Sequence, residues 1–145
     1  MDEQLDFFRQ LVRAEILLYN QVDARIKAAH GVSVGTIELL SMLSRLEHPR
    51  VEDIVRELDL RVGTASKVVD RLAEAGWLER TPNPHDRRSS WLVITDAGQA
   101  LLKAAVPTFE ASVRELAGVT LSAAEQRTLH GLLGRLAAGL GPQPS

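Results

Sequence analysis

The sequence contains no cysteine, which excludes disulfide bonds, thiolate metal sites and thiol redox chemistry. Aromatic residues make up only 4% of the chain, so Leu, Val, Ile and Ala must fill most of the core. No apolar run approaches the roughly 18 residues that a membrane helix needs, and no basic start followed by an apolar run resembles a signal peptide. We therefore expect a cytoplasmic protein without a membrane partner.

The remaining composition is typical of a globular domain, with 45% hydrophobic and 25% charged residues in a chain of 145. The net charge of −2 hides an asymmetry. Residues 61–95 carry six basic and four acidic side chains, while the rest of the chain carries eleven basic and fifteen acidic ones. Because affinity for DNA follows the local basic surface more than the total charge, nucleic acid is a candidate partner.

Signals of enzymatic chemistry are missing. The sequence has no glycine-rich phosphate loop, no nucleophile elbow and no pair of metal ligands at helical spacing. The histidines, His30, His48, His85 and His130, are scattered, and a lone histidine more often has a surface or capping role than a metal-binding one. We therefore expect no catalytic residues, cofactor or metal, although a metal-responsive regulator stays open as an alternative.

Apolar residues spaced by three or four positions predict four helices in the first half of the chain. The first runs from Asp2 to about Ala29 and ends at Gly31, where glycine suits a left-handed helix stop. The others are a helix capped by Ser33 and broken by Pro49, a short helix from about Val51 to Leu58 with Leu58 inward, and a helix from Gly63 to Ala75. Arg50 stands where a capping Ser or Thr is usual, which predicts a weak start for the short helix.

After Gly76, the sequence predicts a two-stranded hairpin that begins at Trp77-Leu78, followed by two more helices. Thr95 is expected to cap the first of them, and Pro107 within it should kink or divide it. Ser122-Ala123-Ala124-Glu125 fits a capping box that starts the last helix. Residues 141–145 are expected to form a disordered tail.

The loop from Thr81 to Ser90 connects the two predicted strands. Pro82 and Pro84 restrict the backbone, so we expect a stiff and extended loop. In an extended chain Asp86 and Arg88 fall on one side and can pair, while Arg87 faces the other way. An arginine held in this manner suits a narrow minor groove of DNA. The alternative interpretation is a solvated hairpin turn.

A short helix, a tight turn, a second helix and a hairpin occur in the order of a winged helix-turn-helix. We therefore predict a mainly α protein with a small β-hairpin wing, and a helical dimerisation region around it. Small residues at the start of the second helix would let its backbone approach the major groove, where basic side chains reach phosphates or guanine edges. The predicted DNA-binding residues of this recognition helix are Gly63, Thr64, Ser66, Lys67, Asp70 and Arg71, and those of the wing are His85, Asp86, Arg87, Arg88 and Ser89.

The region from Val51 to Gly98 resembles the multiple-antibiotic-resistance regulator (MarR) family. The segments that carry the resemblance are Ala65-Ser66-Lys67-Val68-Val69-Asp70-Arg71-Leu72, Ala75-Gly76-Trp77-Leu78-Glu79-Arg80, Asp86-Arg87-Arg88-Ser89 and Leu92-Val93-Ile94-Thr95-Asp96-Ala97-Gly98. The resemblance implies a transcriptional regulator, most often a ligand-responsive repressor, that binds a pseudo-palindromic operator in double-stranded DNA as a homodimer. It also implies that residues 1–30 and 96–140 form the dimer, that residues 33–95 bind DNA, and that a small anionic or aromatic effector regulates binding.

The predicted effector pocket lies between the dimer helices and the winged region. Its candidate polar side chains for an anionic effector are Arg13, Tyr19, Arg25 and Arg45, although each could instead reach solvent or pair with a carboxylate. The apolar stripes of the terminal helices exceed what a small winged domain covers, and a two-fold interface would bury them.

The alternative function is a winged helix that binds proteins without specific DNA binding.

Overall fold

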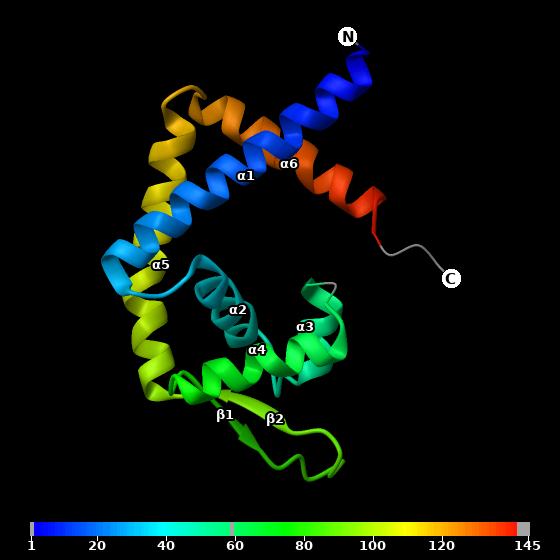
Figure 1. The fold of residues 1–145 in the computed structure, drawn as a ribbon, viewed down its shortest axis with the longest axis vertical. Coiled ribbons are helices and arrows are strands. Elements are labelled where there is room, and N and C mark those ends of the chain that lie inside the picture. The colour runs from blue at the N-terminus through cyan, green and yellow to red at the C-terminus, as the bar shows by residue number, and fades with distance from the viewer. Residues whose placement is uncertain (1, 59, 142–145) are drawn as a thin grey trace. The chain divides into compact units, whose positions relative to one another are not determined.

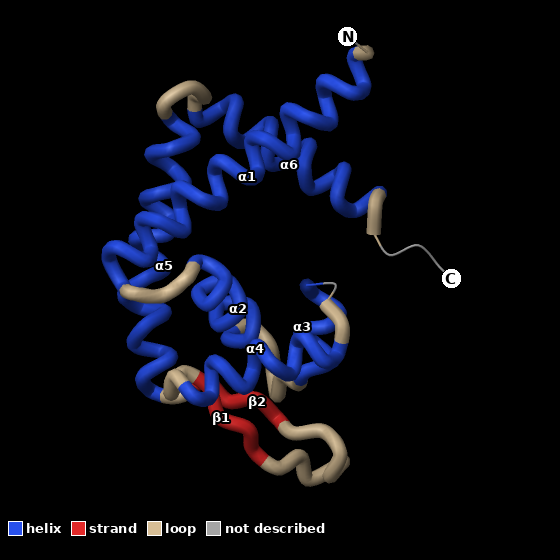
Figure 2. Tube along the Cα trace, in the orientation of Figure 1, coloured by secondary structure: helices blue, strands red, loops and turns tan. Residues whose placement is uncertain are grey.

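The structure is a computed structural model, and it describes residues 2–58 and 60–141. Within these residues the chain forms six helices and one two-stranded antiparallel sheet, as Figures 1 and 2 show. The contacts between residues divide the chain into one compact unit that ends at Phe109 and a second that begins at Glu110. In the described part of the chain, every helix is too short or too polar to cross a lipid bilayer.

Helix α1 (Glu3–His30) has the predicted extent and both predicted ends. The Asp2 carboxylate accepts a hydrogen bond of 3.0 Å from the backbone N–H of Gln4, and Gly31 ends the helix at φ 72°. Only Val22 and Ile26 of this helix are buried, both near its C-terminal end. Most of the apolar stripe of α1 is therefore exposed in the single chain.

Helix α2 (Val34–Ser44) is the central helix of the core and contributes five buried residues, Val34, Ile37, Leu39, Leu40 and Leu43. Ser33 caps it as predicted, since its hydroxyl accepts from the Thr36 backbone N–H at 3.2 Å. A second cap comes from α1: the Asp23 carboxylate accepts from the Val34 N–H at 2.9 Å and pairs with Lys27 at 2.7 Å. These bonds tie the start of α2 to α1.

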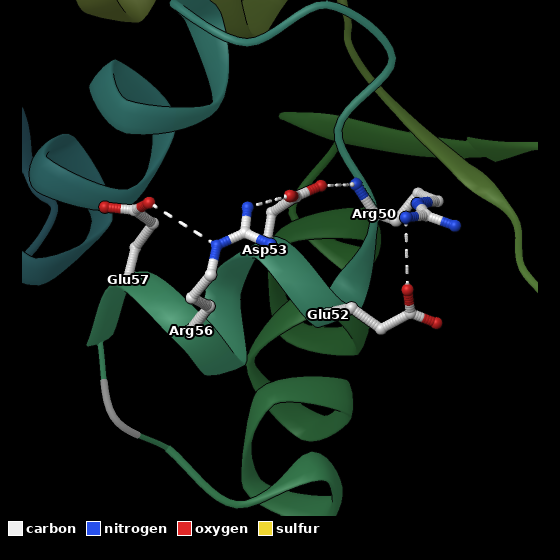
Figure 3. Close-up of polar contacts among 5 residues, drawn as sticks. All are labelled: Arg50, Glu52, Asp53, Arg56 and Glu57. Atoms are coloured by element: carbon white, nitrogen blue, oxygen red, sulfur yellow. Dashed lines mark hydrogen bonds and ion pairs between the residues drawn. The ribbon is translucent and has the colours of Figure 1, made fainter. Parts of the chain in front are cut away.

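Helix α3 (Val51–Leu58) begins directly after Arg50, and its predicted weak start stays a prediction, although an aspartate inside the helix bonds the residue before it (Figure 3). The Asp53 carboxylate accepts from the Arg50 backbone N–H at 2.7 Å, which supplies the cap from inside the helix. The Arg50 guanidinium pairs with Glu52 at 3.3 Å, and Arg56 donates to Asp53 at 2.5 Å. Leu58 was expected to face inward, but 43% of its surface is exposed.

Strands β1 (Leu78–Thr81) and β2 (Trp91–Ile94) form the predicted hairpin after helix α4 (Val62–Glu74). Leu78 lies opposite Ile94, and Thr81 lies opposite Trp91. Leu78 and Leu92 are almost fully buried, so one face of the hairpin joins the core. The Leu92 N–H also donates to the Pro49 carbonyl at 2.7 Å, which fastens the segment before α3 to the edge of the sheet.

Thr95 joins the hairpin to helix α5 (Asp96–Gly118) and caps it as predicted. Its hydroxyl accepts from the Gly98 N–H at 3.0 Å and donates to the Gly76 carbonyl at 2.5 Å. Gly76 adopts φ 86°, the left-handed conformation expected at the end of α4. One hydroxyl thus closes the base of the hairpin and starts the next helix.

Helix α5 continues through Pro107 as one helix, so of the two predicted outcomes the division of the helix was wrong, and the kink stays a prediction. A proline at this position removes the hydrogen bond to the carbonyl of Lys103. Both residues are exposed, so water can reach that carbonyl.

The second unit contains helix α6 (Ala123–Gly139), which begins with the predicted capping box. The Ser122 hydroxyl accepts from the Glu125 N–H, and the Glu125 carboxylate accepts from the Ser122 N–H, each at 3.1 Å. The apolar residues of α6 are exposed. Of the predicted disordered tail, residues 142–145 lie outside the described residues.

Candidate nucleic-acid interface

Helix α4 has one buried face and one polar face. Ala65, Val69 and Leu72 are buried at the four- and three-residue spacing of a helix. The predicted recognition residues are on the outside: Gly63, Thr64, Lys67, Asp70 and Arg71 are exposed, and Ser66 is half-buried. The side chain of Arg61, the N-cap residue, makes no capping hydrogen bond to the first turn of this helix. The structure therefore gathers the six predicted residues on one accessible helix.

The tip of the hairpin consists of two consecutive turns, so the prediction of an extended loop was wrong. The Asp86 N–H donates to the Asn83 carbonyl, and the Ser89 N–H donates to the Asp86 carbonyl, each at 3.3 Å. Side-chain oxygens brace both turns, because Asn83 Oδ1 accepts from the His85 N–H at 2.8 Å and Asp86 Oδ1 accepts from the Arg88 N–H at 2.9 Å. This is the usual role of Asn and Asp at the start of a turn.

The turns also change the predicted partner of Asp86. Its carboxylate binds the backbone of Arg88 and not the guanidinium, so the prediction of an Asp86–Arg88 ion pair was wrong. In residues 2–58 and 60–141, no carboxylate pairs with the guanidinium of Arg87 or Arg88, and both side chains are exposed. Figure 1 shows the loop that carries them projecting beyond the strands. Two positive side chains are therefore available at the tip of the wing.

Arg80 is a third arginine of this surface, and it was not among the residues predicted for the site. It lies in β1, where its guanidinium pairs with Asp70 of α4 at 2.6 Å and reaches Ser66 Oγ at 3.4 Å. The alternation of side chains in a strand could have indicated this position, since Arg80 follows the buried Leu78 by two residues and therefore lies on the same face of β1. A groove of about 290 Å³ between α3, α4 and the wing is lined in part by Ser66, Arg80 and Arg88.

The histidines lie in separate places. His30 shares a hydrogen bond of 2.9 Å with Thr108, and His48 stacks on Trp91. His85 and His130 are exposed in the wing and in α6. Across the residues that the structure describes, no three histidine or carboxylate side chains come together as a metal site.

The four residues predicted for an effector pocket are distributed over several surfaces. Tyr19 lines a cavity of about 410 Å³ between α1, α2 and α4, together with residues such as Arg71 and Trp77. Arg13 lines an open groove along α1, and Arg25 is exposed on the same helix. Arg45 lies at the end of α2, where its guanidinium donates to Ser41 at 3.1 Å. Only Tyr19 of the four is among the residues that line the cavity.

Burial and the nearby carboxylate of Glu38 raise the pKa of Tyr19. The phenol therefore stays protonated at neutral pH and can donate a hydrogen bond into the cavity. Burial likewise raises the pKa of Glu38. The cavity wall thus combines apolar side chains with a phenol and with Arg71 of the recognition helix.

Known proteins resemble this chain in both sequence and fold. The model of the MarR family matches residues 32–90. The HTH-type transcriptional regulator PecS of Dickeya dadantii is 31% identical over 129 residues, which are 87% of this chain and 76% of PecS. The chain belongs to the MarR family. The multiple antibiotic resistance protein MarR of Escherichia coli is 30% identical over 81 residues, which are 56% of each protein.

Solved structures of MarR-family proteins share the fold. A MarR-family regulator of Streptomyces coelicolor, crystallised with DNA, has a TM-score of 0.87 and 24% identity, and the match covers 99% of this chain and 91% of that one. A mutant of the Escherichia coli MarR protein, crystallised with operator DNA, has a TM-score of 0.84 and 20% identity, with 94% and 96% coverage. Membership of the MarR family confirms the predicted winged helix-turn-helix and the assignment as a transcriptional regulator rather than an enzyme.

Proposed function

We propose that this MarR-family regulator binds double-stranded operator DNA as a homodimer through α4 and the wing, and that it represses transcription until a small ligand weakens the complex. The main observation in support is that two neighbouring elements both expose basic side chains. Helix α4 exposes Lys67 and Arg71, and the wing exposes Arg87 and Arg88. Related proteins have been crystallised with DNA.

Helix α4 is suited to the major groove. Gly63 and Thr64 at its start are small and exposed, so the backbone can approach base edges and phosphates. Lys67 and Arg71, one turn apart, extend from the exposed face toward phosphates or guanine edges. The wing then reaches the adjacent minor groove, where Arg88 enters and His85 and Ser89 contact the backbone.

The dimer is proposed from the uncovered apolar surface of the terminal helices. Helix α1 exposes Leu5, Phe7, Phe8, Val12, Ile16 and Leu17. Helix α6 exposes Leu129, Leu132, Leu133 and Leu136, and Leu140 directly after it is also exposed. A two-fold interface between copies would bury such surfaces. Residues 1–30 and 96–140 accordingly form the dimerisation region, and residues 33–95 bind DNA. The two recognition helices of the dimer would lie about 34 Å apart, one turn of DNA.

The cavity beside α4 supports ligand control. Its volume of about 410 Å³ is within the range of small-molecule sites, and Tyr19 and Arg71 supply polar groups for an anionic or aromatic ligand. Arg71 belongs to the proposed DNA-binding face, so a ligand that holds it in the cavity competes with DNA. We expect such a ligand to lower operator affinity by about 1–3 kcal/mol of coupling. A titration of aromatic carboxylates, followed by the tryptophan emission to which Trp77 in the cavity wall contributes and by DNA affinity, tests this step.

The central experiment selects bound sequences from random duplex DNA and measures the affinity of the selected duplex at several salt concentrations. Arg88→Ala should weaken binding by about 1–3 kcal/mol while the fold stays intact. Arg127→Ala, which removes one positive charge from α6, is the charge-matched control. Because α6 lies in the proposed dimerisation region, analytical ultracentrifugation checks its dimer, and with the dimer intact it should bind as the wild type does. The affinity should fall steeply with salt, with a log–log slope near −0.9 for each phosphate neutralised.

Two results would favour the alternatives. A wild-type protein that selects no sequence, but binds a protein partner without salt dependence, is a winged-helix interaction module. Operator binding that appears only after metal addition indicates a metal-responsive regulator. In a reporter assay, repression by the wild type that Arg88→Ala relieves is the expected result, and activation would contradict the repressor assignment.

A further inference from the structure

Arg80 connects the wing to the recognition helix. It follows the buried Leu78 by two residues in β1 and lies on the same face of the strand. One nitrogen of its guanidinium is 2.6 Å from Asp70 Oδ1, and the other is 3.4 Å from Ser66 Oγ. Ser66 and Asp70 are four residues apart, so they are neighbours on one face of α4. A single side chain thus contacts two residues of the proposed DNA-binding face.

Asp70 presents an electrostatic problem for a helix that approaches DNA. Its side chain is 55% exposed on a helix whose other charged side chains near the start, Lys67 and Arg71, are basic. A free carboxylate on that face would be repelled by the phosphates, and its desolvation in the groove would oppose binding. Among the described residues, Arg80 is the only basic side chain paired with Asp70.

We infer that Arg80 is a positioning residue of the DNA-binding surface, which neutralises Asp70 and holds the Asp70 carboxylate beside β1. The inference rests on the proposed function. Arg80 acts through Asp70 and is not itself a phosphate contact. The guanidinium fits this role because its planar fork serves two acceptors at once, which a lysine ammonium does not do with the same geometry.

A double-mutant cycle separates the two possible roles of Arg80. The proteins are the wild type, Arg80→Ala, Asp70→Asn and the double variant, and the probe is the duplex that the wild type selects from random DNA. We expect Arg80→Ala to weaken binding about 10-fold, because it leaves Asp70 uncompensated. Asp70→Asn removes the charge itself and supplies the second background, in which the effect of Arg80→Ala is measured again relative to Asp70→Asn. The double variant should bind as tightly as Asp70→Asn alone.

The salt dependence gives a second, independent readout. If Arg80 acts through Asp70, adding Arg80→Ala to the Asp70→Asn protein changes neither the affinity nor the salt slope. If Arg80 binds a phosphate, Arg80→Ala weakens binding equally in both backgrounds and reduces the slope by about 0.9, which overturns the inference. An unchanged affinity of Arg80→Ala in the wild-type background also overturns it.

Folding controls keep the test decisive. Arg80→Gln keeps most of the side-chain stem along β1 and removes the charge, so it replaces Arg80→Ala if the alanine variant unfolds at lower temperature. Arg80→Lys retains the charge and should lose no more than about 3-fold in affinity. A wild type that binds its selected duplex no better than a shuffled one refutes the proposed function as well. Wild-type binding with no effect at Arg80 refutes this inference alone.

Discussion

The imidazole of His48 stacks on the indole of Trp91, with ring centroids 4.0 Å apart and an angle of 19° between the planes. His48 holds a left-handed backbone at φ 51°, and it is the only residue other than glycine with a positive φ in the described part of the chain. Together with the bond from Leu92 to the Pro49 carbonyl, this stack attaches the segment before α3 to β2.

Substitution of His48 should separate the stack from the backbone strain. His48→Ala loses the ring contact and keeps the unfavourable φ, so we expect the free energy of unfolding to fall by about 0.5–1.5 kcal/mol. His48→Gly also loses the contact but tolerates the left-handed backbone, so it should exceed the alanine variant in stability by about 1 kcal/mol. Urea unfolding measures both, and an alanine variant as stable as the glycine variant would show that φ 51° carries no strain.

Asp23 should stabilise the fold by capping α2. The ion pair with Lys27 and the bond from the Val34 N–H lower the pKa of Asp23. Asp23→Ala removes both, and we expect a loss of about 0.5–2 kcal/mol in the free energy of unfolding at neutral pH.

The contribution of Asp23 should also depend on pH. Because its folded pKa lies below the unfolded value of about 4, the stabilisation is complete above that value and is lost as the pH falls through the folded pKa. The difference in urea midpoint between the wild type and Asp23→Ala should therefore shrink at acid pH. A difference that is constant with pH would show that the carboxylate charge does not matter.

Two glycines in the first turns of helices should respond in opposite ways to alanine. At Gly98 a Cβ atom would meet the Trp77 carbonyl and would lie 2.7 Å from Ile94 Cγ2, so the backbone must shift. We expect Gly98→Ala to lower the free energy of unfolding by about 1–3 kcal/mol. At Gly63 a Cβ would meet nothing within 4 Å, so Gly63→Ala serves as the control and should be neutral or stabilising by up to about 1 kcal/mol. Equal thermal stability of the two variants would contradict the close contact at Gly98.

Gly63→Ala should nevertheless weaken binding to the selected duplex. The residue is exposed at the start of α4, and a methyl group there would hold the helix away from the groove. We expect a loss of about 3- to 10-fold, or up to about 1.4 kcal/mol, in fluorescence anisotropy. An unchanged affinity together with unchanged stability would mean that the start of α4 does not approach the DNA closely.

The sequence predicted most helix ends because their signals are local. Ser33, Gly31, Gly76 and Thr95 act within a few residues of the chain, and all four have the predicted role. The weak start predicted for α3 rested on Arg50, the residue before the helix, and the structure adds a bond from the Arg50 N–H to a carboxylate inside the helix. The cap comes from Asp53, at the third helical position.

The details of the candidate site depend on longer-range geometry. The prediction for Asp86 assumed an extended loop, in which its carboxylate would face the Arg88 guanidinium. In the structure the loop forms a turn, and the carboxylate accepts from the Arg88 backbone N–H instead. The contact of Arg80 with Asp70 joins a strand to a helix, so it depends on how β1 packs against α4. Helical periodicity identified the face of α4 but gave no information on that packing.

The side chains of Asn83 and Asp86 stabilise the turns of the wing, and this should reduce the entropy cost of DNA binding. A flexible loop loses conformational entropy when it settles into a groove, and that loss subtracts from affinity. Here the turn conformation is already held by side-chain bonds in the unbound chain, and Asn83 is itself buried. If the wing binds DNA as proposed, its backbone enters the complex preordered, and the ordering that remains is confined to the long side chains of its arginines.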